Sequence, residues 1–308
     1  MMTILDGKNT AKAIYGELNN TIVKLKKQHK RVPKLAIVLV GDNAASKIYV
    51  ANKIKACQAV GINVELIKQD KKITERKLLS IIDNLNADKT IDGFIVQLPL
   101  PPHIDESRIL QAIDWRKDVD GLTPSNVGRV EQGLPAIVSA TPRGITELMR
   151  RYNIKTTGKH VVVIGRSNIV GKPMAMLLMQ RPYLSLPGMS ASAIGNATVT
   201  ICHSETKNLA AICKTADIII VAAGSPGLLK ANMVKDNVIV IDVGINRVID
   251  TNSPKGYKIV GDVDYEKVRQ KASYITPVPG GVGPMTVASL LQNTMQAYKM
   301  ASKNKKRK

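Results

Sequence analysis

The chain has few aromatic residues, few cysteines and no long hydrophobic run. Its 308 residues include one Phe and one Trp, so aliphatic side chains must fill the core, as in the buried strands of parallel sheets. Three cysteines, Cys57, Cys202 and Cys213, have neither C-x-x-C nor zinc-ligand spacing. We therefore expect free thiols in a reducing compartment, without disulfides or a structural metal. Residues 1–28 lack the apolar core of a secretory signal and no later run could span a membrane, which predicts a cytoplasmic protein without a membrane partner.

Acidic residues are scarce relative to basic ones. The chain has 24 Asp and Glu against 45 Lys and Arg, a net charge of +21 that would attract phosphates, polycarboxylates or nucleic acid. The basic residues are spread widely, apart from the tail KNKKRK at 303–308, and neither zinc-finger spacing nor aromatic base-stacking residues accompany them. We interpret the charge as a solvated basic surface and expect no nucleic-acid partner. A nucleic-acid binder that senses a dinucleotide stays open as an alternative.

Strand and helix patterns alternate along almost the whole chain, which is typical of α/β proteins. The length exceeds what one core usually serves, so we expect two domains with a boundary near residue 140. Strands are predicted at 34–40, 63–67, 93–98, 161–164, 196–204, 217–221 and 238–242. Helices are predicted from about residue 7, after Asn43 to before Gly61, at 74–85, at 106–113, from 141, from 171 and at 286–301.

The segment 161–173, VVVIGRSNIVGKP, is the most informative part of the sequence. An apolar β-branched run turns at Gly165 and enters a helical pattern at Gly171, as where a parallel strand leads into a helix that holds phosphate. Ser167 stands where G-x-G-x-x-G has its second Gly, and Gly171 comes one place late. The segment predicts a dinucleotide site, with a strand-to-helix connection without a ligand as the plainer alternative.

The strand that follows indicates which dinucleotide binds. It ends in Cys202-His203-Ser204, without the Asp or Glu that normally holds the ribose diol of NAD at the strand tip. Arg166 and Ser204 suit an additional phosphate, because guanidinium and hydroxyl donors match phosphate oxygens. We therefore expect NADP rather than NAD, and we interpret His203 as a strand-end histidine without a catalytic part.

Three segments of the first domain could carry chemistry. Tyr49 and Lys53 are four residues apart and project from one face of a helix. Gln97 ends a strand at the edge where α/β sheets bind ligands. Asp118-Val119-Asp120-Gly121 follows a helix, and its Gly suggests a turn that exposes a carboxylate. A packing Tyr, a solvated Lys and a turn-forming Asp are the alternatives. The run 274–286, YITPVPGGVGPMT, is expected to be irregular and to line a pocket.

A series of motifs extends over essentially the whole chain and carries a specific resemblance. They are GDN at 41–43 with Ala45-Ser46, Tyr49-Val50-x-x-Lys53, VQLPLP at 96–101, KDVDG at 117–121, Thr141-Pro142 with Gly144, GRSNIVGKP at 165–173, ATVTICHSET at 197–206, DVGIN at 242–246, GDV at 261–263 and ITPVPGGVGPMT at 275–286. In these motifs the chain resembles the methylenetetrahydrofolate dehydrogenase/methenyltetrahydrofolate cyclohydrolase family.

The resemblance implies an N-terminal substrate domain, a Rossmann-like NADP domain and a C-terminal helix that packs back on the first domain. The boundaries would be 1–140 plus 286–302, 141–285, and a basic tail at 303–308. It also implies oxidation of 5,10-methylenetetrahydrofolate with NADP, hydrolysis of the methenyl product to 10-formyltetrahydrofolate, a part in purine biosynthesis, and a homodimer. The basic surface suggests that the folate is polyglutamylated.

By resemblance, Lys53 is the general acid/base of hydrolysis, Gln97 supports it, Tyr49 stacks beside the folate and Asp120 anchors the pterin. A lysine can act near neutral pH if burial and a hydrogen-bonding neighbour disfavour its ammonium form. The other folate contacts would come from Val96, Leu98, Pro279, Gly280, Gly281 and Val282. The NADP contacts would come from Gly165, Arg166, Ser167, Ile169, Val170, Gly171, Pro173, His203, Ser204, Thr206, Gly224, Gly244 and Ile245, and no metal is expected.

The chain departs from the family pattern at three places. Ala140 stands where a Cys often precedes Thr-Pro, Trp115 stands where a Pro is common, and the Pro/Gly/Ser-rich surface loop expected at 181–195 is longer than usual. Some relatives have only dehydrogenase activity, or use NAD with metal and phosphate. Lys53 and Gln97 favour the form with two activities, and a dehydrogenase that has lost hydrolysis is the nearer alternative.

Overall fold

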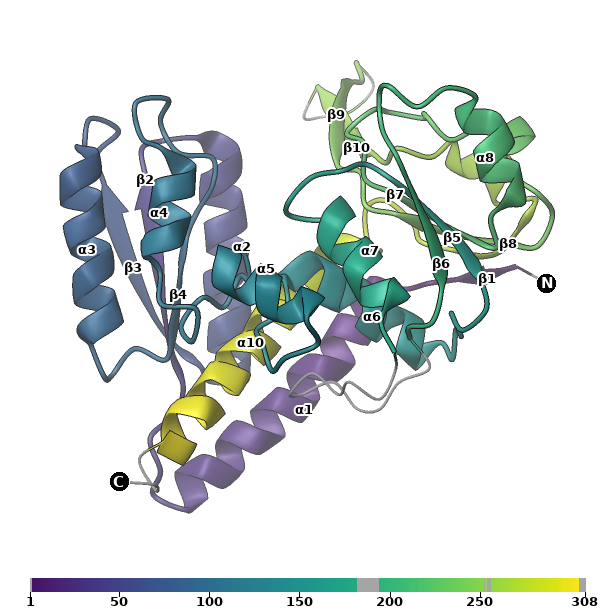
Figure 1. Cartoon of the computed structure of the whole chain (residues 1–308). Coiled ribbons are helices and arrows are strands. Elements are labelled where there is room, and N and C mark those ends of the chain that lie inside the picture. Colours follow the sequence, from purple (N-terminus) through teal and green to yellow (C-terminus); the bar gives the residue numbers. More distant parts are fainter. Residues whose placement is uncertain (1, 182–193, 252, 254–255, 305–308) are drawn as a thin grey trace. The chain divides into compact units, whose positions relative to one another are not determined.

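The computed structural model describes residues 2–181, 194–251, 253 and 256–304 (Figure 1). The chain forms two compact units. Unit 1 consists of residues 2–11 and the described part of 141–286, and unit 2 consists of residues 12–140 and 287–304. The first residues belong to unit 1, not to the N-terminal domain of the sequence boundaries, because β1 (Thr3–Ile4) pairs in parallel with β11 (Ala272–Ile275).

Unit 2 is built on a parallel sheet with strand order β3-β2-β4. The central strand β2 (Lys34–Val40) pairs along its whole length with β3 (Asn63–Gln69) and over four residues with β4 (Gly93–Val96). Its apolar run is buried almost throughout, which is typical of parallel strands covered on both faces. β4 is shorter than predicted, and Gln97 continues the pairing only through its N–H, which donates to Val38 O at 2.9 Å.

The helices of unit 2 are set by side chains at their N-termini. Asn43, Thr74, Asp105 and Thr123 each accept a backbone N–H from the first turn of the helix that follows. These helices are α2 (Ala44–Val60), α3 (Glu75–Ala87), α4 (Glu106–Ala112) and α5 (Pro124–Glu131). Side chains of α3 and α4 share one hydrophobic core with β2 and β4.

Three further helices connect the two units along the chain: α1 (Gly7–Lys27), α6 (Ala140–Arg151) and α10 (Val282–Asn304). Within unit 2, the C-terminal part of α10 packs on the N-terminal domain as predicted, since Asn293 donates to Val119 O and Tyr298 donates to Arg31 O. The helix begins four residues before the predicted Thr286. Pro284 fits its first turn because the N–H groups there have no helical partner.

Unit 1 contains a six-stranded parallel sheet in the order β1-β11-β8-β7-β5-β6. Strands β5 (His160–Ile164), β7 (Ile218–Val221) and β8 (Val238–Asp242) lie inside this sheet, and β6 (Thr198–Cys202) forms one edge. The chain passes from β5 to β6 on one side and returns to β7 on the other, which is the reversal that places ligands at the carboxyl ends of Rossmann-like sheets. Helices α7 (Gly171–Met179), α8 (Leu209–Thr215) and α9 (Tyr265–Val268), a 3-10 turn (Ala231–Met233) and the hairpin β9–β10 (Asn246–Ile249 and Tyr257–Val260) complete the unit.

The predicted α/β class and the Rossmann-like second sheet are confirmed, and one expectation about local structure is wrong. Residues 274–286 are not irregular at their ends, because Tyr274 and Ile275 pair in β11 and α10 starts at Val282. Residues 182–193 of the expected surface loop and 305–308 of the tail lie outside the described residues. Among the described helices, none has the length and apolarity needed to cross a membrane.

Candidate active site

Unit 2 brings three of the predicted polar residues together. Lys53 Nζ lies 3.1 Å from Gln97 Oε1 and 4.0 Å from Asp120 Oδ2. Gln97 Nε2 donates to Leu98 O at 2.7 Å, which turns the amide oxygen toward the lysine. The Lys53 side chain is only 12% exposed and that of Asp120 is 24% exposed. An amine, an amide oxygen and a carboxylate therefore meet where the carboxyl end of β4 approaches α2.

Helix α2 presents Lys53 and Tyr49 from one face. Asn43 Oδ1 accepts from Ser46 N at 3.0 Å at its start, and Gly61 ends it with a left-handed φ of 82°. Tyr49 lies one turn before Lys53 and is 45% exposed, so its ring is available for stacking. Cys57 lies one turn after Lys53, and burial raises the pKa of its thiol to about 12. The thiol is therefore neutral near pH 7.

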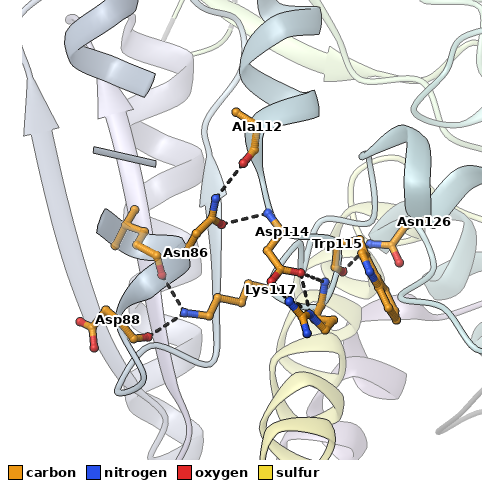
Figure 2. Close-up of polar contacts among 9 residues, drawn as sticks. Asn86, Asp88, Ala112, Asp114, Trp115, Lys117 and Asn126 are labelled. Atoms are coloured by element: carbon orange, nitrogen blue, oxygen red, sulfur yellow. Dashed lines mark hydrogen bonds and ion pairs between the residues drawn. The ribbon is translucent and has the colours of Figure 1, made fainter. Parts of the chain in front are cut away.

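The loop that carries Asp120 is anchored to its surroundings by polar contacts (Figure 2). Lys117 Nζ donates at 2.7 Å to the carbonyls of Leu85 and Asp88 at the end of α3. Asn86 donates to Ala112 O and accepts from Asp114 N, so the start of the loop is held as well. These contacts fix the path of the chain toward Asp120 without using its carboxylate.

In unit 1, the turn after β5 has the geometry expected of a dinucleotide-binding loop. Gly165 has φ +124°, and a Cβ there would collide with Ala222 O, as one on Gly171 would with Gly165 O. Ser167 Oγ accepts from Val170 N at 3.1 Å, which shapes the entry into α7. The exposed residues of this turn are Arg166, Ser167, Asn168 and Ile169, whereas Gly171 and Pro173 are buried in the first turn of α7.

The end of β6 forms a compact polar turn. His203 N donates to Thr206 Oγ1 at 2.9 Å, and His203 Nδ1 accepts from Glu205 N at 3.3 Å. Ser204 is exposed and its hydroxyl donates to Glu205 Oε1 at 3.2 Å. His203 therefore shapes the turn. The exposed Arg166 has donors of the kind that an additional phosphate requires, and the Ser204 hydroxyl could add one by turning away from Glu205. These residues fit NADP.

Two acidic residues that the sequence argument did not single out hold the neighbouring loops of unit 1. Asp262 Oδ2 accepts from Ala223 N at 2.8 Å and from Gly224 N at 2.9 Å. Asp242 Oδ1 accepts from Gly244 N and from Asp262 N, each at 2.9 Å, and Asp242 Oδ2 accepts from Val263 N at 3.0 Å. Burial raises the pKa of Asp242 to about 6, although these backbone donors favour its charged form. The carboxylates thus set the positions of Gly224 and Gly244.

A pocket of unit 1 joins two sets of predicted contacts. Asp242–Ile245 line it together with Pro277–Pro284, so Gly244 and Ile245 lie beside the Pro279–Val282 segment, and the expectation that this segment lines a pocket is confirmed. The other predicted folate contacts, Val96 and Leu98 with the lysine cluster, belong to unit 2. Val96 is buried in β4 and Leu98 is half-buried.

The fold and the site define a class of protein: an α/β enzyme with one dinucleotide-binding unit and a second unit that bears ionisable residues. Residues 5–120 match the sequence profile of the tetrahydrofolate dehydrogenase/cyclohydrolase catalytic domain, and residues 139–302 match the profile of the corresponding NAD(P)-binding domain. The chain belongs to the tetrahydrofolate dehydrogenase/cyclohydrolase family.

Individual relatives match over nearly their whole length. The bifunctional protein FolD of Flavobacterium johnsoniae is 53% identical over 305 residues, which are 99% of this chain and 100% of that protein. FolD of Porphyromonas gingivalis is 52% identical over 296 residues, 96% of this chain and 97% of that protein. The crystal structure of the FolD enzyme from Campylobacter jejuni is 47% identical with a TM-score of 0.88, covering 97% of this chain and 99% of that chain. The Trypanosoma brucei dehydrogenase-cyclohydrolase, complexed with NADP and an inhibitor, is 38% identical with a TM-score of 0.88 and 98% of each chain covered.

Proposed function

We propose that this chain is the bifunctional enzyme that oxidises 5,10-methylenetetrahydrofolate to 5,10-methenyltetrahydrofolate with NADP and hydrolyses the methenyl form to 10-formyltetrahydrofolate. The single observation that carries the site is the meeting of Lys53, Gln97 and Asp120, with 3.1 Å and 4.0 Å from the lysine nitrogen to its two neighbours. The chain has the dinucleotide-binding unit that oxidation requires and a proton-handling group that hydrolysis requires.

The oxidation needs alignment more than it needs a protein base. A hydride leaves the methylene bridge, and NADP, when bound, supplies the acceptor and takes both electrons. The protein's part is to hold the two reactants in register. Arg166 and Ser204 would hold the additional phosphate, and the glycines at 165 and 224 would let the backbone approach the cofactor closely.

The hydrolysis needs proton transfer. Water adds to the methenyl carbon and gives up both of its protons as the formyl C=O forms. One proton goes to N5 as its bond to that carbon breaks, and the other is released to solvent. Lys53 is the group that moves these protons, and Gln97 Oε1 holds its nitrogen at 3.1 Å. Asp120 would accept hydrogen bonds from the amino and ring N–H groups of the pterin, and Tyr49 would stack beside the folate.

A Lys53→Met variant tests this assignment. We expect it to fold, to bind NADP normally and to lose at least a hundredfold in methenyl hydrolysis, since general acid/base catalysis contributes about 10²–10⁴-fold. Methenyl absorbance and NADPH formation measure the two steps separately. Lys55→Met, an exposed lysine of the same helix, is the matched control and should keep both activities. Unaltered hydrolysis in Lys53→Met would contradict the assignment.

The division of labour between domains belongs to the same proposal. Residues 1–140 with 286–302 would bind folate and perform hydrolysis, and 141–285 would bind NADP. Support comes from the lysine cluster in unit 2 and from the glycine turn in unit 1. Residues 2–11 contribute structurally to unit 1 through β1, and the predicted folate contacts at 279–282 line a pocket of unit 1.

We propose further that the folate carries a polyglutamate tail. Lys47 and Lys68 line a pocket of unit 2 beside Asp42, and Lys71 also acts on that carboxylate. One carboxylate cannot neutralise three lysines, so the pocket has an excess of positive charge that suits a chain of carboxylates. The KM of a pentaglutamate substrate should rise with salt, while that of the monoglutamate changes little. Equal salt dependence would contradict the proposal.

The proposal includes the oligomeric state of the enzyme. A homodimer is proposed from the family resemblance, and Ile249 in β9, which is 88% exposed, is a position at which to test it. Sedimentation of the wild type and of Ile249→Lys would measure the oligomeric state, and a monomeric wild type would contradict the homodimer.

A cytoplasmic location is supported by the three cysteines, which are free and buried. The 10-formyltetrahydrofolate would serve purine biosynthesis.

A further inference from the structure

Asp120 is the accessible residue of a loop whose other polar groups are turned inward. Asp118, two residues earlier, is 2% exposed and accepts from Gly121 N at 2.9 Å, from Thr123 N at 2.8 Å and from Asn126 Nδ2 at 2.9 Å. Gly121 has φ +70°, and a Cβ there would lie 2.5 Å from Ser139 N. The loop therefore wraps around the Asp118 carboxylate and leaves Asp120 to face Lys53.

A side chain from a distant part of the sequence completes this arrangement. Asn293 of α10 lies 174 residues beyond Val119 and donates to its carbonyl at 2.8 Å. The same amide nitrogen donates to Val138 O at 2.9 Å, and Asn293 is fully buried. On the other side, Asp120 O accepts from Ala140 N at 3.1 Å. The peptide groups before and after Asp120 are thus both tied to the segment 138–140.

We propose that Asn293 is a positioning residue for Asp120, setting the place of this carboxylate relative to Lys53 and so the affinity for the folate ring. The inference rests on the proposed function, because it assigns the pterin to Asp120. A buried amide costs free energy that an apolar side chain would not, so packing of α10 alone does not account for it. Both of its donor bonds instead go to carbonyls that flank the Asp120 loop.

The test compares two buried amides of α10. Asn293→Leu removes both bonds to the loop region, and Gln296→Met removes the bond that Gln296 Nε2 makes to Ala136 O at 2.8 Å. We expect Asn293→Leu to raise the KM for the folate substrate at least fivefold in both reactions and to leave the KM for NADP unchanged. Gln296→Met should change neither KM. Thermal unfolding of both variants reports their loss of stability.

A double-mutant cycle with Asp120→Asn shows whether Asn293 acts through Asp120. We expect Asn293→Leu to add little to the folate KM in the Asp120→Asn background, because coupled residues are not additive. Fully additive effects, or an equal KM rise in Gln296→Met, would contradict the positioning role while leaving the proposed function intact. An unsubstituted enzyme without folate turnover would contradict both. If Asn293→Leu does not fold, Asn293→Thr, with a smaller side chain, provides the same comparison, and the same KM split is expected.

Discussion

The buried carboxylate of Asp242 fixes the backbone around it by accepting several N–H groups. It ends β8, accepts three N–H groups and lies next to Asp262, which accepts from the loop at Ala223 and Gly224. A Cβ on Gly261 would collide with Asp242 Oδ2, and one on Gly244 with Asp262. Glycine is therefore required at both positions by the carboxylates.

Asp242 makes a measurable contribution to the pH dependence of stability. Its pKa is raised from 3.8 to about 6 in the folded chain, so the native state keeps this proton to higher pH than the unfolded state. The resulting stabilisation is fully present below pH 3.8 and lost as pH rises to about 6. A shift of this size corresponds to about 3 kcal/mol.

The measurement is the free energy of urea unfolding from pH 3.5 to 8 for the wild type and for Asp242→Asn, which does not titrate. We expect the wild-type value minus the variant value to fall as pH rises toward 6 and then to level off. Carboxylates with a lowered pKa make the protein more stable as pH rises. Asp217 is one of them, since its hydrogen bond to Lys235 lowers its pKa, and the subtraction removes this contribution because both proteins share it. A difference that is flat or rises across this range would contradict the assignment.

Sequence patterns could single out some residues of the candidate site and not others, for a physical reason. Tyr49, Lys53 and Gln97 could be singled out because helical spacing and a strand end place them at one edge of a sheet. Asp118 and Asp120 have the same local pattern, and only the hydrogen bonds of the fold separate a buried loop anchor from an accessible carboxylate. Asn293 carries no local signal, because its partners lie more than a hundred residues away.

Among the elements, those with many repeats of their pattern could be predicted closely. The strand at 34–40 has the predicted bounds, and α2 lies between its predicted cap residues. The sequence missed α5, which has eight residues, and the two-residue strand β1, which exists through its pairing with β11. Short elements have too few positions for periodicity, so tertiary contacts decide them.

Asp92 connects three elements of unit 2. It is 2% exposed and accepts from both guanidinium nitrogens of Arg31 at 2.6 Å and from Lys34 N at 2.9 Å, at the amino end of β2. Arg31 O in turn accepts from Tyr298 in α10. Asp92, which directly precedes β4, therefore connects β4 to the start of β2. Through Arg31 it also connects both strands to the C-terminal helix α10.

We expect Asp92→Asn to lower the free energy of unfolding by about 1–3 kcal/mol, because it removes the charge of a buried carboxylate whose partner, the Arg31 side chain, is 37% exposed. Kinetic constants for folate should hold, since Asp92 lies at the opposite end of the strands from Lys53 and Gln97. Urea unfolding and steady-state kinetics measure the two quantities. Asp42→Asn, which breaks the exposed pair with Lys47, is the control and should not change stability measurably. A large change in folate KM for Asp92→Asn would contradict this separation.

At the scale of the whole molecule, the chain combines two units with separate cores. The nucleotide-binding turn, the Asp242–Asp262 pair and their sheet belong to unit 1, whereas the lysine cluster belongs to unit 2. The sequence predicts a change of domain near residue 140, where α6 begins. Residues 2–11 have no local pattern that separates them from the first domain, because β1 pairs with a strand about 270 positions later.

Added NADP should protect the two units unequally against hydrogen exchange. A ligand at one hundred times its Kd stabilises the state that binds it by about 2.7 kcal/mol, or about a hundredfold in exchange of amides that need that unit to open. We expect this slowing in β5, β7 and β8, and much less in β2 and β4. Exchange measured by mass spectrometry with NAD as the weaker ligand gives the comparison. Equal slowing in both sheets would contradict the expectation that the two units open independently of each other.

Because neither unit is a continuous stretch of sequence, the order of synthesis constrains how the protein matures. When residues 12–140 have left the ribosome, the strands of the β2 sheet are complete, but Asn293, Gln296 and Tyr298 have not yet been synthesised. The hydrogen-bond partners of these three side chains lie within residues 12–140. All of unit 1 must be translated before those side chains emerge. In a nascent chain, the loop that carries Asp120 therefore lacks its hydrogen bonds to α10 until late in translation. A shortened chain that ends before α10 would keep Lys53, Gln97 and Asp120 and lose these supporting contacts.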